Sequence, residues 1–138
     1  MNEIQKLKEM QASLQVFYQK INNIHWNIKG LEFFEIHAQS DKLKDDVLNF
    51  VDEIAEKVVM KGEVALGSYT EVLEASKITE LTSQIFDYKQ VLKVLVNDLK
   101  ILLQLAESFE WSARVQPIFD EVLLSLDKWL WQFDAMSK

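Results

Sequence analysis

A chain of 138 residues that is 49% hydrophobic and 27% charged has the composition of a globular protein with a substantial core. Its three glycines and single proline disfavour turn-rich β folds, and the absence of cysteine excludes disulfides, thiolate zinc sites and a thiol nucleophile. The formal net charge of −7 disfavours binding to nucleic-acid phosphates and favours cations. We therefore expect one all-α domain spanning residues 1–138.

Helical periodicity begins close to the N-terminus and predicts two long helices. Apolar residues of the first recur at intervals of three, four or seven, and Gly30 is expected to end it. The second is predicted from about Leu31 to about Met60, with Gly62 closing it. Their apolar positions are Ile4, Leu7, Leu14, Phe17, Ile21 and Ile24, then Leu43, Val47, Phe50 and Ile54.

The rest of the chain predicts a connection and two further helices. Within the connection at residues 63–77, Ser68 is placed to cap a short helix through Leu73, with Glu71 completing a capping box. The third long helix is predicted to start near Thr79 and the fourth near Pro117, a favourable first-turn residue. Their apolar positions are Leu81, Ile85, Leu92, Leu95, Leu99 and Leu102, then Phe119, Val122, Leu126, Leu130 and Phe133. This order, with one long crossover, is typical of a ferritin-like four-helix bundle.

No segment of the sequence resembles a secretory signal or a membrane span. The N-terminal residues MNEIQKLKEM are charged throughout, and the most apolar segment, VLKVLVNDLKILLQLA, is interrupted by Lys93, Asp98 and Lys100. Together with the absence of cysteine, this pattern leads us to expect a cytoplasmic protein.

Four candidate metal ligands share one face of the second helix. At about 100° per residue, His37, Asp41, Asp52 and Glu56 fall within one quarter of its surface and point away from its apolar stripe. A charged face exposed to solvent would be enough to explain the carboxylates. The same arc, however, also carries five apolar residues, which are Phe34, Ala38, Leu48, Ala55 and Val59.

The spacing of these ligands is palindromic about position 46.5 and predicts a shared site between two copies of the chain. His37 and Asp52 lie roughly 22 Å apart along a straight helix, so one chain cannot bring both to one ion. An antiparallel second copy on a two-fold axis would place Glu56 of one copy beside His37 of the other. His25, one turn before the end of the first helix, would face the same pocket. Two imidazoles and three carboxylates suit Fe(II), Mn(II) or Zn(II).

The segment HWNIKGLEFFEIHAQSDKLKDDVLNFVDEIAEKV closely resembles the signature of the Dps family, the mini-ferritins named as DNA-binding proteins from starved cells. The similarity continues through LGSYTEVLEASKI to LDKWLWQFDA. The resemblance implies a hollow dodecamer that oxidises Fe(II) with hydrogen peroxide or oxygen, stores Fe(III) and protects against oxidative stress. It assigns the catalytic, iron-binding ferroxidase centre at the two-fold interface to His25, His37, Asp41, Asp52 and Glu56. Trp26 resembles a family tryptophan for which electron donation and packing both remain open.

The sequence departs from the family pattern in three places. Only 24 residues precede His25 and four follow Asp134, so we expect no lysine-rich tail and little or no DNA binding. The region before the last helix usually carries acidic pore residues, and here it has Ala113, Arg114 and Pro117, with Asp120 and Glu121 as unplaced substitutes. Trp129 replaces a frequent His or Phe and is expected to pack.

The main hypothesis from the sequence is an iron-oxidising, iron-storing mini-ferritin. Three alternatives stay open at this point. The chain could form a nucleoid-associated shell that protects DNA, with a secondary role in iron chemistry. It could form a shell that has lost iron flux through an altered pore. It could also carry manganese or zinc on the same ligands.

Overall fold

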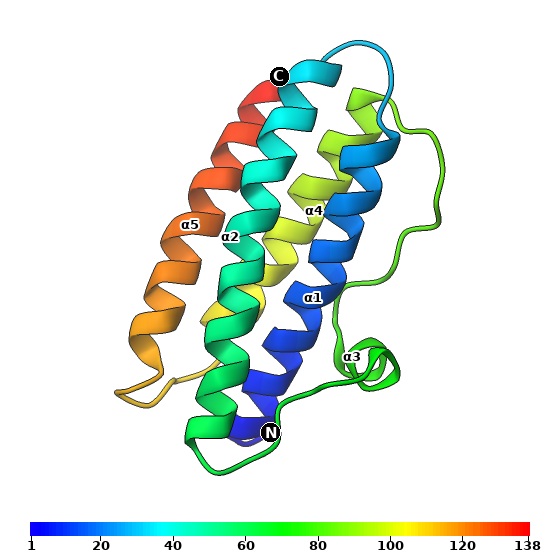
Figure 1. Ribbon diagram of the computed structural model, residues 1–138. Helices are drawn as coiled ribbons and strands as arrows, with labels where there is room; N and C mark the ends of the chain where they lie inside the picture. Colours follow the sequence, from blue (N-terminus) through cyan, green and yellow to red (C-terminus); the bar gives the residue numbers. More distant parts are fainter.

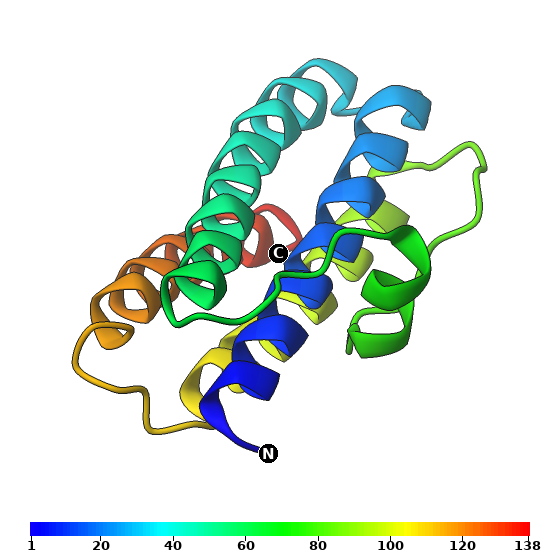
Figure 2. The same ribbon diagram turned by 60° about the horizontal axis from the view of Figure 1, so that its bottom comes forward.

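Four long helices lie side by side in a bundle, and a fifth, short helix lies outside it (Figure 1). The computed structural model describes residues 1–138. In chain order the helices are α1 Glu3–Asn27, α2 Phe33–Met60, α3 Tyr69–Ala75, α4 Tyr88–Glu107 and α5 Gln116–Met136. Figure 2 shows α3 against α1, on the side of the bundle away from α5. The all-α class, the four-helix bundle and the short helix in the long connection are confirmed.

The interior is one cluster of 32 buried apolar residues contributed by every helix. The predicted stripe of α2, which is Leu43, Val47, Phe50 and Ile54, is buried, and only Ile4 among the predicted apolar positions of α1 is partly exposed. Burying one such large side chain stabilises the fold by about 1.5–3 kcal/mol. This burial fixes which face of α2 points inward, and therefore which face is left for a site. None of the helices has the length and apolar character needed to cross a membrane.

The turn between α1 and α2 differs from the predicted one. α1 ends at Asn27, three residues before Gly30, because the following backbone leaves the helix to pair with a distant segment. Lys29 N donates to Phe86 O at 3.0 Å, and Phe86 N donates to Asn27 O at 3.2 Å. Gly30 instead occupies the turn itself, with a φ of 87° that glycine adopts without strain. The pairing ties the α1–α2 turn to the chain that leads into α4.

The predicted start of the third long helix near Thr79 is wrong, because α4 begins at Tyr88. Residues 79–87 lie in irregular structure, where Asn23 Nδ2 donates to Leu81 O at 2.9 Å. Ile85 is 65% exposed rather than part of the core. The helix starts where a capping box forms: Asp87 accepts from Gln90 N at 2.8 Å, and the Gln90 side chain accepts from Asp87 N at 2.9 Å.

Replacing Asp87 with alanine is expected to lower the free energy of unfolding by about 1 kcal/mol, because α4 loses its side-chain cap. Thr79→Ala, at the position where periodicity predicted the helix start, is expected to change it by less than about 0.5 kcal/mol. Denaturant unfolding followed by circular dichroism compares the two variants with wild type. Equal losses in both variants would contradict a helix start at Asp87.

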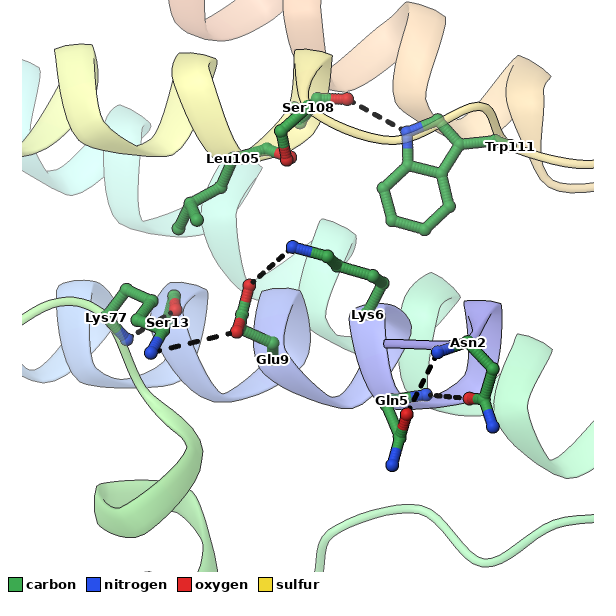
Figure 3. Close-up of polar contacts among 10 residues, drawn as sticks. Asn2, Gln5, Lys6, Glu9, Ser13, Lys77, Leu105, Ser108 and Trp111 are labelled. Carbon is green, nitrogen blue, oxygen red and sulfur yellow. Dashed lines mark hydrogen bonds and ion pairs between the residues drawn. The ribbon is translucent and has the colours of Figure 1, made fainter.

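Side chains along α1 hold its N-terminus and anchor the long connection (Figure 3). Asn2 and Gln5 form a reciprocal capping box, with both hydrogen bonds 2.9 Å long. Farther along α1, Ser13 Oγ accepts from Lys77 N at 2.9 Å, and the carboxylate of Glu9 lies 4.0 Å from Lys77 Nζ. These contacts fix the connection, and with it α3, along one side of α1.

Three predicted helix ends are confirmed. Gly62 follows the end of α2 with a φ of 83°, and Glu63 N donates to Val58 O at 3.2 Å. Ser68 caps α3 by accepting from Glu71 N at 3.3 Å, although α3 continues two residues past Leu73. The predicted capping box is not completed, because the Glu71 carboxylate accepts from Ser68 Oγ at 2.6 Å instead of from the Ser68 backbone. α5 has its proline in the first turn.

Candidate metal centre

The two histidines of the chain lie against each other at the α1–α2 end of the bundle. Their ring centroids are 3.7 Å apart and their planes differ by 12°, so the imidazoles are stacked. Phe33 also stacks on His37, with ring centroids 5.1 Å apart. Because α1 and α2 are antiparallel neighbours joined by a short turn, residues twelve apart in sequence become adjacent in space.

Hydrogen bonds to the Nδ1 atoms hold both rings. His37 Nδ1 lies 2.7 Å from the backbone O of His25, and this nitrogen donates, since a carbonyl oxygen can only accept. Neutral His37 therefore keeps its lone pair on Nε2, the atom free to bind a metal. His25 Nδ1 lies 2.9 Å from Ser40 Oγ, and Ser40 Oγ donates to His37 O at 3.1 Å. Sequence reasoning missed Ser40, although a serine three residues after a candidate ligand on one helix is a readable signal.

Asp41 faces the free nitrogen of His25 across a short gap. Its Oδ1 atom lies 4.0 Å from His25 Nε2, too far for a hydrogen bond. Metal bonds to imidazole nitrogen and carboxylate oxygen are each about 2.0–2.2 Å, so the gap matches a cation between the two atoms. Lys44 Nζ lies 3.3 Å from the same Asp41 oxygen and supplies a positive charge beside the gap.

The surroundings of His25 disfavour its protonation. Burial lowers the pKa of His25, and the positive charge of Lys44 and the neighbouring His37 act in the same direction, against the attraction of Asp41. A lowered pKa means that protons compete less with a metal for the imidazole as the pH falls. The shift favours the neutral form that a ligand requires.

Asp52 and Glu56 form a second, separate pair of carboxylates farther along α2. Repulsion by the negative charge of Asp52 is the main cause that raises the pKa of Glu56 above its ordinary value. Two like charges on the solvent face of a helix are unfavourable unless a cation approaches them. In one chain no group of three or more His, Asp and Glu side chains is arranged to hold a metal ion. The structure thus brings His25, His37 and Asp41 together, and Asp52 beside Glu56, but does not join the two sets.

The face that carries these residues also exposes large apolar side chains. Trp26 is 62% exposed, Phe34 86% and Val59 59%. Beside them, a pocket of about 650 Å³ is lined by α1, α2, α3 and residues 80–83, and includes Trp26 and Leu48. Exposed apolar surface of this kind is typical of an interaction site rather than of a face that meets only water.

The remaining predicted positions are also placed. Trp129 packs, as expected: its Nε1 atom donates to Asp46 Oδ2 at 2.8 Å, and its ring stacks on Phe133. Asp120 and Glu121 are exposed near the start of α5, where the Asp120 carboxylate accepts from the Gln116 side chain at 2.9 Å. These two acids lie on a different helix from all five candidate ligands.

The comparisons of this chain with known proteins agree on one family. Residues 4–110 match the model of the ferritin-like domain. A DNA protection during starvation protein of Helicobacter pylori is 27% identical, with 98% of each chain covered. A solved Dps protein of Vibrio cholerae O1, described as one of the ferritin-like diiron-carboxylate proteins, is 28% identical, with 98% of this chain and 88% of that chain covered and a TM-score of 0.92. Dps of Staphylococcus aureus is 27% identical over 98% of this chain and 94% of that one, with a TM-score of 0.84.

Proposed function

Because the chain belongs to the ferritin-like family, and within it to the Dps mini-ferritins, we propose that it oxidises Fe(II) and stores the Fe(III) product inside a homo-oligomeric shell. Family membership assigns the general role in iron storage and protection. The proposal adds the site, its five ligands, the oxidant and the assembly. The observation that carries it is the pair of stacked imidazoles, whose ligand set one chain leaves incomplete.

The stacking favours two ions rather than one. The lone pair of Nε2 lies in the plane of the imidazole ring, so a bound ion lies in or near that plane. The two rings have centroids 3.7 Å apart and planes that differ by only 12°, so the planes are nearly parallel and do not converge near the ligand atoms. Each histidine then serves its own ion, as expected for a two-metal centre. This fits a diiron carboxylate site.

A second copy of the chain is the proposed source of the missing carboxylates. Related by a two-fold axis near the middle of α2, it brings its own Asp52 and Glu56 to the histidines of the first copy. The exposed apolar side chains beside the ligands would be buried in that contact, which favours association. Two complete centres form per dimer, and six such dimers make the proposed dodecamer.

The chemistry follows from the ligand set. Carboxylate oxygens are hard, negatively charged ligands that stabilise Fe(III) more than Fe(II), and they therefore make Fe(II) easier to oxidise. Two Fe(II) ions supply two electrons, and with two protons they reduce one hydrogen peroxide to two waters. Delivering both electrons at one centre avoids the one-electron step that releases hydroxyl radical. Dioxygen is the alternative oxidant.

The proposal predicts that the protein keeps oxidised iron in solution. Anaerobic Fe(II) mixed with half an equivalent of hydrogen peroxide is expected to yield Fe(III) that co-elutes with the protein in size-exclusion chromatography. The control is serum albumin at the same mass concentration. Iron is expected to precipitate with albumin, and precipitation with this protein as well would contradict storage.

Direct DNA binding is not part of the proposed function. Relatives are named for DNA protection, but removal of Fe(II) and peroxide protects DNA without contact. The net charge of −7 per chain would repel phosphate in an assembly.

A further inference from the structure

Ser40 connects the two histidines and carries an inference beyond the five ligands. The side chain is fully buried on α2, one turn after His37 and three residues from it. Its Oγ atom lies 2.9 Å from His25 Nδ1 and 3.1 Å from the backbone O of His37. His37 Nδ1 in turn reaches the backbone O of His25 at 2.7 Å. The His37 ring is therefore hydrogen-bonded directly to the backbone of His25. The His25 ring is linked to the backbone of His37 through the Ser40 hydroxyl.

The directions of these bonds decide which nitrogen of His25 carries the proton. A hydroxyl has one hydrogen, and a carbonyl oxygen can only accept. If Ser40 donates to His37 O, it must accept from His25 Nδ1–H, and both bonds form. If Ser40 instead donates to His25 Nδ1, the contact with His37 O is lost. The first arrangement makes one more hydrogen bond and is therefore favoured, because a buried polar group left without a partner is destabilising.

We propose that Ser40 is the positioning residue of the centre, holding His25 in the Nδ1–H tautomer with a free Nε2 lone pair directed at the metal site. The hydrogen-bond geometry behind this inference is independent of the proposed function, whereas its consequence for metal binding rests on that function. Free histidine slightly favours the opposite tautomer, with the proton on Nε2. Without Ser40, His25 would therefore place a proton where the metal must bind.

Asp41 makes the choice of tautomer matter. Its Oδ1 atom lies 4.0 Å from His25 Nε2, beyond hydrogen-bond distance in the metal-free chain. A proton on Nε2 would draw this carboxylate into a hydrogen bond and close the gap. A lone pair on Nε2 repels the carboxylate, so the gap stays open for a cation.

The tautomer can be measured in the metal-free protein. Magic-angle-spinning NMR of protein labelled with 13C and 15N only at histidine distinguishes Nδ1–H from Nε2–H, and the chain has two histidines to assign. Wild type is expected to show Nδ1–H at both. Ser40→Ala should convert His25 to mainly Nε2–H and leave His37, held by a carbonyl, as an internal reference. Ser40→Thr keeps the hydroxyl and should restore the wild-type signals.

Ser13→Ala is the matched control. Ser13 is also fully buried and uses its hydroxyl in one hydrogen bond, from Lys77 N, on a part of α1 away from the histidines. This variant should leave both tautomers unchanged. An Nε2–H signal for His25 in wild type, or Nδ1–H retained in Ser40→Ala, would overturn the role of Ser40.

A Co(II) titration of the same metal-free proteins separates this inference from the proposed function. Co(II) stands in for Fe(II) without being oxidised, and its visible absorption reports binding. Ser40→Ala should weaken binding about 10- to 100-fold, as for other residues that orient a ligand, while Ser40→Thr and Ser13→Ala bind as wild type. Unchanged affinity in Ser40→Ala would overturn the inference. Absence of Co(II) binding in wild type would instead count against the proposed metal centre, whatever the tautomer.

Discussion

Replacing Asp52 with alanine is expected to slow peroxide-driven Fe(II) oxidation by at least about 100-fold. Loss of a residue that only orients a ligand costs about 10- to 100-fold in metal affinity or activity, and loss of a ligand should cost more. Removing Asp52 also takes away one of the negative charges that would stabilise Fe(III). Stopped-flow absorbance of Fe(III) formation, with Fe(II) and peroxide at a ratio of two to one, measures the rate.

The control for this prediction is Glu53→Ala. Glu53 is the residue after Asp52 on α2, and its side chain points about 100° away from that of Asp52 around the helix. Its replacement by alanine removes the same charge. This variant should retain the wild-type rate within about a factor of two, since Glu53 is not a candidate ligand and lies at the partly exposed surface, where substitutions have small effects. If Asp52→Ala oxidised iron as fast as wild type, the assignment of the ferroxidase centre would be wrong.

Two inactive variants are expected to restore activity when they assemble together. His37→Ala destroys the histidine half of each centre, and Asp52→Ala destroys the carboxylate half. A dimer with one copy of each has one centre in which both halves are damaged and one in which both are intact. Random mixing makes half of the dimers mixed, so about one quarter of all centres should be functional.

The measurement uses co-expressed variants with two different affinity tags, so that only mixed assemblies are purified. The matched control pairs His37→Ala with His25→Ala, which lie in the same half, so that no complete centre forms. That pair should stay inactive. If the centre were built within one chain, both pairs would be equally inactive, and the two-fold site would be excluded.

Local sequence patterns were enough to predict most of the helices. The spacing of Leu43, Val47, Phe50 and Ile54 identifies the inward face of α2, because a helix repeats every 3.6 residues regardless of what packs against it. The same repeat places the candidate carboxylates on the outward face. Ser68 capped α3 as predicted, since a cap depends only on the adjacent backbone.

Helix ends that depend on distant contacts were mispredicted. Ile85 has helical spacing with Leu81 and Leu92, yet it lies in an irregular segment bound to α1 and to the α1–α2 turn. Periodicity cannot reveal such a segment, because the competing hydrogen bonds come from residues about sixty positions away. The early end of α1 at Asn27 has the same cause.

The sequence by itself determined which residues are candidate ligands, their order and the palindromic spacing from which a second copy is proposed. Only the tertiary structure decided how the ligands stand to one another. The 3.7 Å stacking of His25 and His37 depends on the close packing of α1 against α2, and so does the reach of Ser40 to His25. Periodicity fixes positions around one helix axis, whereas the distance and orientation between two axes are set by the side chains buried between them.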